Sequence, residues 1–184
     1  YVAIAVFAAT GALAAAWRRQ TFVTAAFFAM VTGVGGGTIR DLLIGAPVFW
    51  VHDRIFAALC IASATVIWIT PARWWRGSGF DWLDALGMAV YAVFGAAKAL
   101  SYGIAPVPAM VMGVLTACAG GIIRDMMAGE PSILMRPELY VTAAALAAGL
   151  YVALSFTGMA PFSAGLIAAG AGFSLRAAAI HWKL

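Results

Sequence analysis

The sequence predicts an all-α membrane protein with seven transmembrane helices, in which a three-helix unit occurs twice in inverted topology and a seventh helix follows. Three observations lead to this prediction: an extreme apolar composition, seven apolar runs joined by short polar segments, and an internal repeat. Of the 184 residues, 65% are hydrophobic and only 10% are charged, whereas soluble domains average about 25% charged residues. The apolar excess extends along the whole chain, so one targeting peptide cannot account for it.

Seven apolar runs account for most of the chain. A transmembrane helix needs about 20 apolar residues, so seven of them would use ~140 residues. The expected helices cover residues 1–17, 21–43, 53–70, 82–101, 106–127, 137–157 and 161–182. Several start at or beside a proline, which the first helical turn tolerates. Because the remainder suffices only for short loops, we expect residues 1–184 to form a single transmembrane domain.

The distribution of Lys and Arg predicts the orientation of the chain. With seven crossings, the side opposite the N-terminus carries eight basic residues: Arg18, Arg19, Arg73, Arg76, Arg124, Arg136, Arg176 and Lys183. The side of the N-terminus carries three: Arg40, Arg54 and Lys98. Because cytoplasmic loops are enriched in basic residues, we expect the N-terminus outside and the C-terminus in the cytoplasm. The basic residues lie between apolar runs rather than in one patch, so no nucleic-acid partner is expected.

An internal repeat appears when the sequence is shifted by 84 residues, without a gap. The segment GGGTIRDLLIGAP at 35–47 then aligns with AGGIIRDMMAGEP at 119–131. We therefore divide the chain into repeat one (1–70), repeat two (82–157) and a seventh helix (161–182). Since each repeat holds three helices, the second copy enters the membrane from the opposite side. Inverted repeats of this kind are typical of proteins that move solutes between the two repeats.

Glycines cluster well inside the second and fifth expected helices. The candidate pore residues are Gly33, Gly35, Gly36, Gly37, Gly120 and Gly121. Glycine lets a helix kink or break, and carbonyls freed at membrane depth need protein, water or an ion. Carbonyl oxygens also suit a partly dehydrated monovalent cation. The alternative is a GxxxG surface for close helix packing, but recurrence in both repeats favours pore lining.

Two Arg-Asp pairs follow the glycines by about one helical turn: Arg40–Asp41 and Arg124–Asp125. Charges at such a depth are costly unless they are paired or hydrated. Adjacent helical residues point about 100° apart, so we expect each arginine to pair with another helix. The pairs then brace each kinked helix and shape the electrostatics at opposite mouths. Alternatively, they extend to the membrane interface and form a capping salt bridge there.

Lys98 is the one lysine within an apolar run. Extension of its long side chain to the membrane surface explains it. As a functional group, it could donate to freed carbonyls of the second helix and act as a voltage-responsive gate. One elementary charge crossing the field is worth about 2.3 kcal/mol per 100 mV.

No catalytic or metal chemistry is expected from the sequence. It contains no nucleophile elbow, no HExxH and no phosphate-binding GxxxxGK[ST] segment. Cys60 and Cys118 fall inside apolar runs without a CxxC or Cys/His neighbourhood, so we interpret both as packing residues. An enzyme is therefore not expected.

At the paired GGGTIRD and AGGIIRD segments, the chain resembles the prokaryotic branch of the trimeric intracellular cation (TRIC) channels. The resemblance covers essentially the whole chain, and the family has glycine-kinked second and fifth helices. It implies a homotrimer with one pore per subunit, conducting monovalent cations, mainly potassium. A bacterial member is expected in the plasma (inner) membrane. The implied partners are further copies of the chain, membrane lipids and monovalent cations; no cofactor is expected beyond permeant K⁺ and a bound lipid.

Animal members of this family carry a Lys-Glu-Val motif on the fourth helix, whose lysine contacts the kinked second helix. Here Lys98-Ala99-Leu100 keeps only the lysine. The resemblance thus implies a gating role for Lys98, and it does not extend to regulation tied to the acidic residue, which this sequence lacks. Two other functions fit the same residues. A secondary transporter of a small solute such as glycine suits inverted repeats equally well, and a membrane scaffold would use the small residues only for packing.

Overall fold

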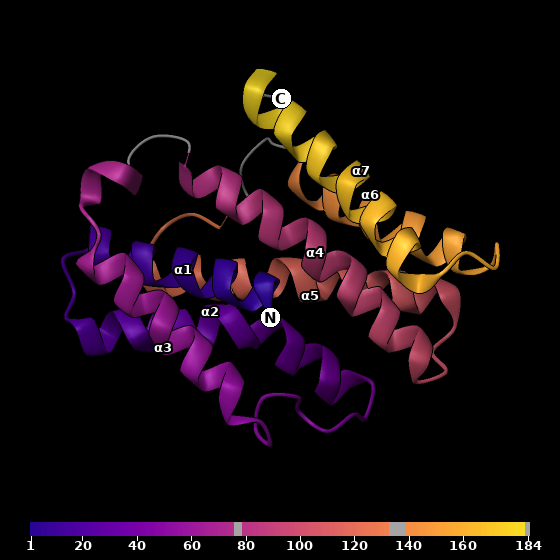
Figure 1. Cartoon of the computed structure of the whole chain (residues 1–184), viewed down its shortest axis with the longest axis horizontal. Helices are drawn as coiled ribbons and strands as arrows, with labels where there is room; N and C mark the ends of the chain where they lie inside the picture. The colour runs from indigo at the N-terminus through magenta and orange to yellow at the C-terminus, as the bar shows by residue number, and fades with distance from the viewer. Residues whose placement is uncertain (76–78, 133–138, 183–184) are drawn as a thin grey trace.

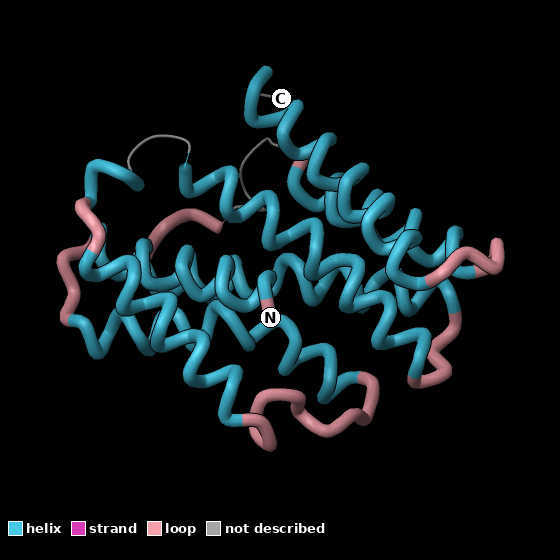
Figure 2. The backbone as a smooth tube through the Cα atoms, viewed as in Figure 1, coloured by secondary structure: helices cyan, strands magenta, loops and turns pink. Residues whose placement is uncertain are grey.

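The computed structural model describes residues 1–75, 79–132 and 139–182, and these are helical throughout apart from connecting loops (Figures 1 and 2). Within them, the fold comprises seven α-helices and one short 3-10 helix, with no strand. The helices are α1 (Val2–Trp17), α2 (Phe22–Leu43), α3 (Arg54–Ile69), η1 (Ala72–Trp75), α4 (Gly79–Ser101), α5 (Pro106–Ala128), α6 (Tyr140–Ser155) and α7 (Pro161–Trp182). The predicted all-α class is confirmed.

The predicted helices and the observed ones agree closely, with one shifted start. Helix α4 begins at Gly79 rather than Trp82, which places Asp81 in its first turn, where a carboxylate favours the positive helix end. The predicted start of the sixth helix, Pro137, lies outside the described residues, as do Arg76, Arg136 and Lys183 from the orientation analysis.

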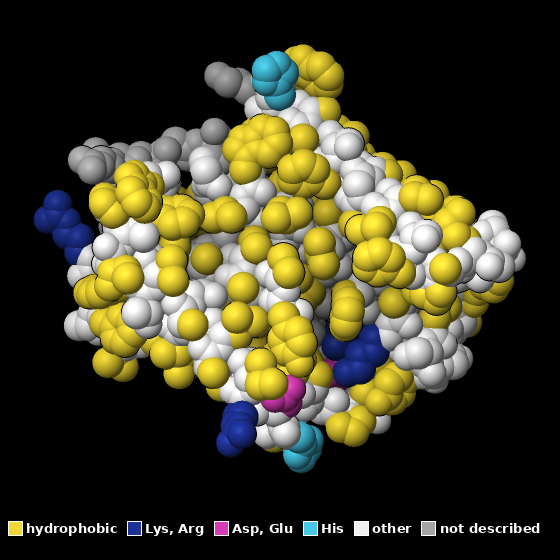
Figure 3. Space-filling model, viewed as in Figure 1, with side chains coloured by type: hydrophobic (Ala, Val, Ile, Leu, Met, Phe, Trp, Pro, Cys, Tyr) yellow, Lys and Arg dark blue, Asp and Glu magenta, His cyan; other side chains and the backbone are white. Residues whose placement is uncertain are grey.

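The helix lengths and composition are those of a membrane protein. Four of the described helices, α2, α4, α5 and α7, are long and apolar enough to cross a bilayer. Helices α1, α3 and α6 are apolar but hold 16 residues each, a rise of about 24 Å that falls short of a bilayer core of about 30 Å. Hydrophobic side chains cover most of the face in Figure 3, with few charged ones between them.

The helices form two packed groups that meet where α2 packs on α5 and where α1 packs on α4. Helix α1 packs on α2 and α3, while α4 packs on α5, α6 and α7; Figure 1 shows these groups side by side. The core between them is rich in alanine, including fully buried Ala8, Ala12, Ala92 and Ala96. Small residues let helix backbones approach closely, which is the usual basis of helix association in membranes.

The glycine-rich helix of each repeat ends in the same way. Gly45 follows α2 with φ 68°, and Gly129 follows α5 with φ 66°. In this left-handed region glycine carries no steric penalty, so it is favoured after a helix end. The next amide then bonds back to the helix: Ala46 N donates to the Asp41 carbonyl at 2.8 Å, and Glu130 N to the Asp125 carbonyl at 2.9 Å. The repeat in the sequence therefore corresponds to a repeat in local structure.

Candidate functional site

The glycines at the crossing of α2 and α5 bring the two backbones into contact. A Cβ added at Gly120 would lie 2.5 Å from the Thr32 carbonyl oxygen, and one added at Gly36 would collide with the Thr116 carbonyl. Each repeat thus presents a glycine to a threonine carbonyl of the other. Both helices run as continuous α-helices through these positions, so neither helix is broken there, while a kink and the lining of a pore stay predictions. At Gly36 and Gly120 the absence of a side chain permits the close contact between the two backbones.

The other candidate glycines face different surroundings and do not form one common lining. A Cβ at Gly33 would lie 3.1 Å from the Cys60 sulfur, and one at Gly35 would lie 3.2 Å from the Ile123 side chain. Gly37 lies under the Phe49 ring. Near Gly121, the Arg124 guanidinium and the Tyr140 hydroxyl would be 3.6 and 3.7 Å from an added Cβ.

At the C-terminal end of α2, one carboxylate is shared by two cations. Arg40 donates to Asp41 Oδ1 from Nε at 2.9 Å and from Nη2 at 2.6 Å. Lys98 Nζ, from α4, lies 2.8 Å from the same oxygen. Asp41 Oδ2 accepts the Phe49 amide at 3.0 Å. Asp41 therefore ties together α2, α4 and the loop after α2.

The structure corrects one sequence-based expectation for this cluster and one of two alternatives. Arg40 was expected to pair across to another helix, but its guanidinium curls back onto the adjacent Asp41. A long, flexible side chain can bridge the roughly 100° between neighbouring helical positions, so an arginine can reach the aspartate next to it on the same helix. For Lys98, donation to freed carbonyls of the second helix was one of two alternatives; its partner on that helix is the Asp41 carboxylate instead.

The cluster at the end of α5 has the opposite arrangement: one guanidinium is shared by two carboxylates. Arg124 Nε donates to Asp125 Oδ1 at 2.9 Å, and Nη1 donates to Asp84 Oδ1 at 2.5 Å and to Thr10 Oγ1 at 3.1 Å. The guanidinium also lies over the Phe80 ring, 4.6 Å from its centroid. Arg124 therefore links α5 to α1 and α4 inside the protein, so for this arginine an interhelical partner was correctly expected.

Sequence reasoning missed Asp84, Thr10 and Arg176. Asp84 was not among the candidate residues; it is buried inside α4, which starts at Gly79 rather than at the expected Trp82. An acidic residue inside an apolar run was the signal that could have identified it. Arg176 on α7 was counted only among the basic residues that predict the orientation of the chain. In the structure it is buried, and its guanidinium lies over the Tyr140 ring, 5.3 Å from the ring centroid.

Each charged cluster adjoins a cavity. The larger, of about 590 Å³, is lined by Arg40, Lys98, Gly37 and Tyr91 together with aromatic and aliphatic side chains; we call it the Lys98 cavity. The smaller, of about 280 Å³, is lined by Arg124 and Asp125 with Arg18, Asp81 and Glu130 among others; we call it the Arg124 cavity. Figure 3 shows basic side chains recessed between hydrophobic ones on the face it presents.

The two cavities lie at opposite ends of the same helices. Helix α1 contributes residues near its start (2–4) to the Lys98 cavity and residues near its end (14–17) to the Arg124 cavity. Helix α4 does the reverse, with residues 90–98 at the Lys98 cavity and 80–81 at the Arg124 cavity. A line between the cavities therefore runs along α1 and α4, past the crossing of α2 and α5.

Comparison with known proteins identifies the family. A family model described as "Glycine transporter" matches residues 1–72 and 81–155. The chain also superimposes on the solved trimeric intracellular cation channel orthologue from Rhodobacter sphaeroides with a TM-score of 0.92 and 40% identity, covering 100% of this chain and 95% of that one. The chain belongs to the prokaryotic TRIC family.

Curated relatives of this TRIC protein point the same way. A "UPF0126 inner membrane protein YadS" from Escherichia coli K12 is 35% identical over 187 residues, covering 100% of this chain and 90% of the relative. A "UPF0126 membrane protein" from Vibrio cholerae is 36% identical over 186 residues, covering 98% of this chain and 77% of the relative. This TRIC chain is thus a membrane protein, and since its solved relatives are ion channels, it is not an enzyme.

Proposed function

We propose that this protein is a potassium-permeable channel for monovalent cations, active as a homotrimer with one pore in each subunit. One observation carries the proposal: a single chain holds two cavities at opposite ends of α1 and α4. Each cavity lies beside the Arg-Asp pair of one repeat. A route that joins the two cavities would cross the membrane inside a single subunit. Likeness to a solved TRIC cation channel orthologue supports the same function.

The charged clusters would serve the channel at its mouths. One ion pair, Arg40–Asp41, lies at the end of α2, and the other, Arg124–Asp125, lies at the end of α5. Each pair holds its helix end in place and keeps polar groups beside one of the two cavities. Lys98 would be the gating residue, because its side chain is 19% exposed whereas that of Arg40 is 3% exposed. It could leave Asp41 while the Arg40–Asp41 pair persists, and its charge would respond to voltage.

The proposal also covers assembly and placement. The trimeric state follows the Rhodobacter sphaeroides relative, which is described as a trimeric channel. The plasma (inner) membrane follows the naming of the Escherichia coli relative. The excess of basic residues on one side of the predicted topology supports an outer N-terminus and a cytoplasmic C-terminus. The 84-residue repeat supports inverted orientations of repeat one and repeat two.

Planar-bilayer recording of the purified protein under a potassium gradient tests this function. Discrete unitary currents that reverse near the potassium equilibrium potential are expected. Protein that remains electrically silent at all voltages, while proteoliposomes accumulate a labelled solute such as glycine, would instead establish the transporter alternative. Chemical crosslinking of the same sample tests the trimer, since a trimeric channel should yield a crosslinked species of three chains and no higher one.

A further inference from the structure

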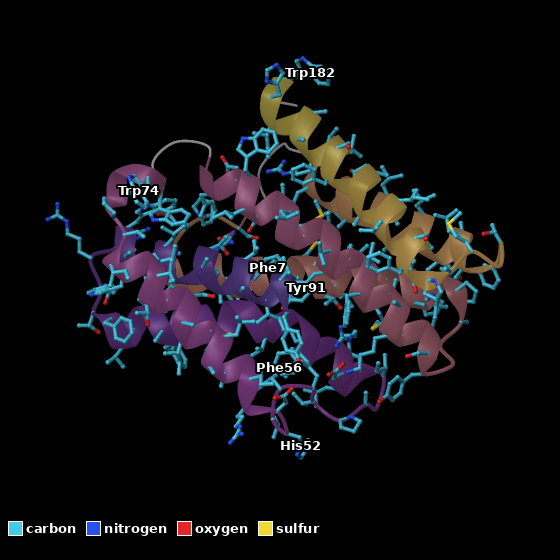
Figure 4. All side chains as sticks on the ribbon, viewed as in Figure 1. Phe7, His52, Phe56, Trp74, Tyr91 and Trp182 are labelled. Carbon is cyan, nitrogen blue, oxygen red and sulfur yellow. The ribbon has the colours of Figure 1, made fainter. Side chains whose placement is uncertain are left out.

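Two aromatic rings lie between the Lys98 cavity and the Arg124 cavity. Phe7 on α1 and Tyr91 on α4 stack with their centroids 5.0 Å apart and an interplanar angle of 28°. Figure 4 shows them side by side near the centre of the molecule. The 84-residue shift makes these two positions equivalent in the two repeats. Tyr91 also lines the Lys98 cavity, whereas Phe7 is buried behind it.

The Phe7 ring occupies space that glycines on two other helices leave open. A Cβ added at Gly87 on α4 would lie 2.8 Å from the ring, and one added at Gly120 on α5 would lie 3.8 Å from it. Any larger residue at Gly87 would displace the ring. A bulky aromatic side chain therefore fills the space between α1, α4 and α5 along the line that joins the two cavities.

A hydrogen bond attaches this aromatic pair to α2. The Tyr91 hydroxyl donates to the Gly33 carbonyl, in the glycine-rich segment of that helix. Both groups are inside the protein, where a hydrogen bond is stronger than in water. The bond fixes the position of the Tyr91 ring, and through stacking it also fixes that of Phe7.

Polar groups continue the line on the far side of the rings. Thr10, Asp84 and Arg124 are buried there. The Thr32 hydroxyl is buried without a hydrogen-bond partner within the described residues. Buried oxygens of this kind are normally satisfied by protein or by water. The aromatic pair thus separates the Lys98 cavity from a polar interior that suits water.

We propose that Phe7 and Tyr91 form the plug that closes the pathway, held shut by the Tyr91–Gly33 hydrogen bond. The inference rests on the channel function proposed above. Opening breaks this hydrogen bond and swings the Tyr91 ring toward the Lys98 cavity, which has room for it. The Phe7 ring then loses its stacking partner and can follow.

The test is single-channel recording of the full-length Tyr91→Phe protein beside the native one. The substitution removes the hydroxyl but keeps the stacked ring, so the closed state loses its attachment to α2. Open probability should rise about three- to tenfold, the effect of one neutral hydrogen bond, with unitary conductance and reversal potential unchanged. Tyr151→Phe is the matched control, because Tyr151 is a buried tyrosine on α6 that lines neither cavity.

The outcomes separate the plug from the channel function itself. If the native protein conducts and Tyr91→Phe has the same open probability as Tyr151→Phe, the proposed plug is wrong but the channel function stands. Silence of native and Tyr91→Phe protein, both intact by gel filtration, would overturn the channel function and the plug with it. The second measurement compares Phe7→Leu alone with the double variant Phe7→Leu and Tyr91→Phe. If the two rings form one plug, their effects on the free energy of opening are non-additive. Full additivity contradicts the plug.

Discussion

Lys98 of α4 and Asp41 of α2 form an ion pair of 2.8 Å inside the protein, although Asp41 is already engaged by Arg40. The pair joins the two repeats at the rim of the Lys98 cavity. Its two members differ in accessibility: Asp41 is fully buried, whereas the Lys98 side chain is 19% exposed. Lys98 is therefore the member that can move.

Replacing Lys98 by methionine should make channel opening less dependent on voltage. A charge that moves through the whole field contributes about 2.3 kcal/mol per 100 mV, and the neutral variant lacks that contribution. The slope of open probability against voltage in planar bilayers measures the change. Arg54→Met is the control, since Arg54 starts α3 and lines neither cavity. An unaltered slope in Lys98→Met would exclude Lys98 as the voltage-responsive group.

Asp41→Asn should destabilise the protein more than Lys98→Met does. The asparagine leaves Arg40 buried without a counter-charge, and removal of one partner from a buried ion pair costs about 3–5 kcal/mol. Lys98→Met leaves the Arg40–Asp41 pair intact and removes a partly exposed charge. Thermal unfolding in detergent, followed by circular dichroism, compares the two variants. Equal melting temperatures would contradict this ranking.

Gly36→Ala should separate α2 from α5. The added methyl would collide with the Thr116 carbonyl, and overpacking of this kind costs about 1–3 kcal/mol. Gly170→Ala provides the control, because no atom lies within 4 Å of the methyl it would add on α7; alanine there should be neutral or stabilising. The measurement is the melting temperature of each variant, and a Gly36→Ala protein as stable as Gly170→Ala would refute close packing as the role of Gly36.

Two larger substitutions, Gly36→Leu and Gly120→Leu, distinguish a protein that moves solutes from a membrane scaffold. Under the channel proposal and under the transporter alternative alike, they should abolish flux in proteoliposomes while the purified protein remains trimeric. Retained flux would show that the crossing does not border the pathway. Loss of the trimer instead of flux would favour a scaffold that uses these glycines for assembly.

Asp84 and Arg124 should prove energetically coupled. Asp84→Ala removes one of the two carboxylates that hold the buried guanidinium, so a loss of about 3–5 kcal/mol is expected. The double variant Asp84→Ala with Arg124→Met should lose less than the sum of the single variants. Additive losses in chemical unfolding would show that the two side chains act independently. The exposed Arg18–Glu130 pair offers a comparison, for which Glu130→Ala should cost less than about 1 kcal/mol.

Much of the fold could be predicted from the sequence, because a bilayer imposes strong and local constraints. Apolar runs must be helical when no water is present to satisfy the backbone. The helix bounds therefore agree within a few residues, apart from the start of α4 and the portion of the sixth run that lies outside the described residues. The Arg-Asp repeat also located the two charged clusters correctly.

The partners of those charges could not be predicted. Arg40 and Arg124 occupy equivalent positions, yet Arg40 shares its aspartate with Lys98, while Arg124 has a second aspartate, Asp84. Under the 84-residue shift Lys98 aligns with Ala14 and Asp84 has no counterpart, so the repeat does not predict either partner, and only the packing of α4 in the folded protein decides where they lie. The glycines show the same limit: their sequence pattern suits both a broken helix and a tight crossing, and continuous helices with close contacts occur at Gly36 and Gly120.

The sequence by itself determined the class of the protein, its helices, the internal duplication and the positions of its two Arg-Asp pairs, since each follows from composition or from a pattern within the chain. Tertiary structure alone decided which charges meet, which glycines touch a neighbouring backbone, and that Phe7 and Tyr91 stack between two cavities. These features depend on contacts between residues far apart in the chain, whose geometry is set by how whole helices pack, and no local pattern encodes that geometry.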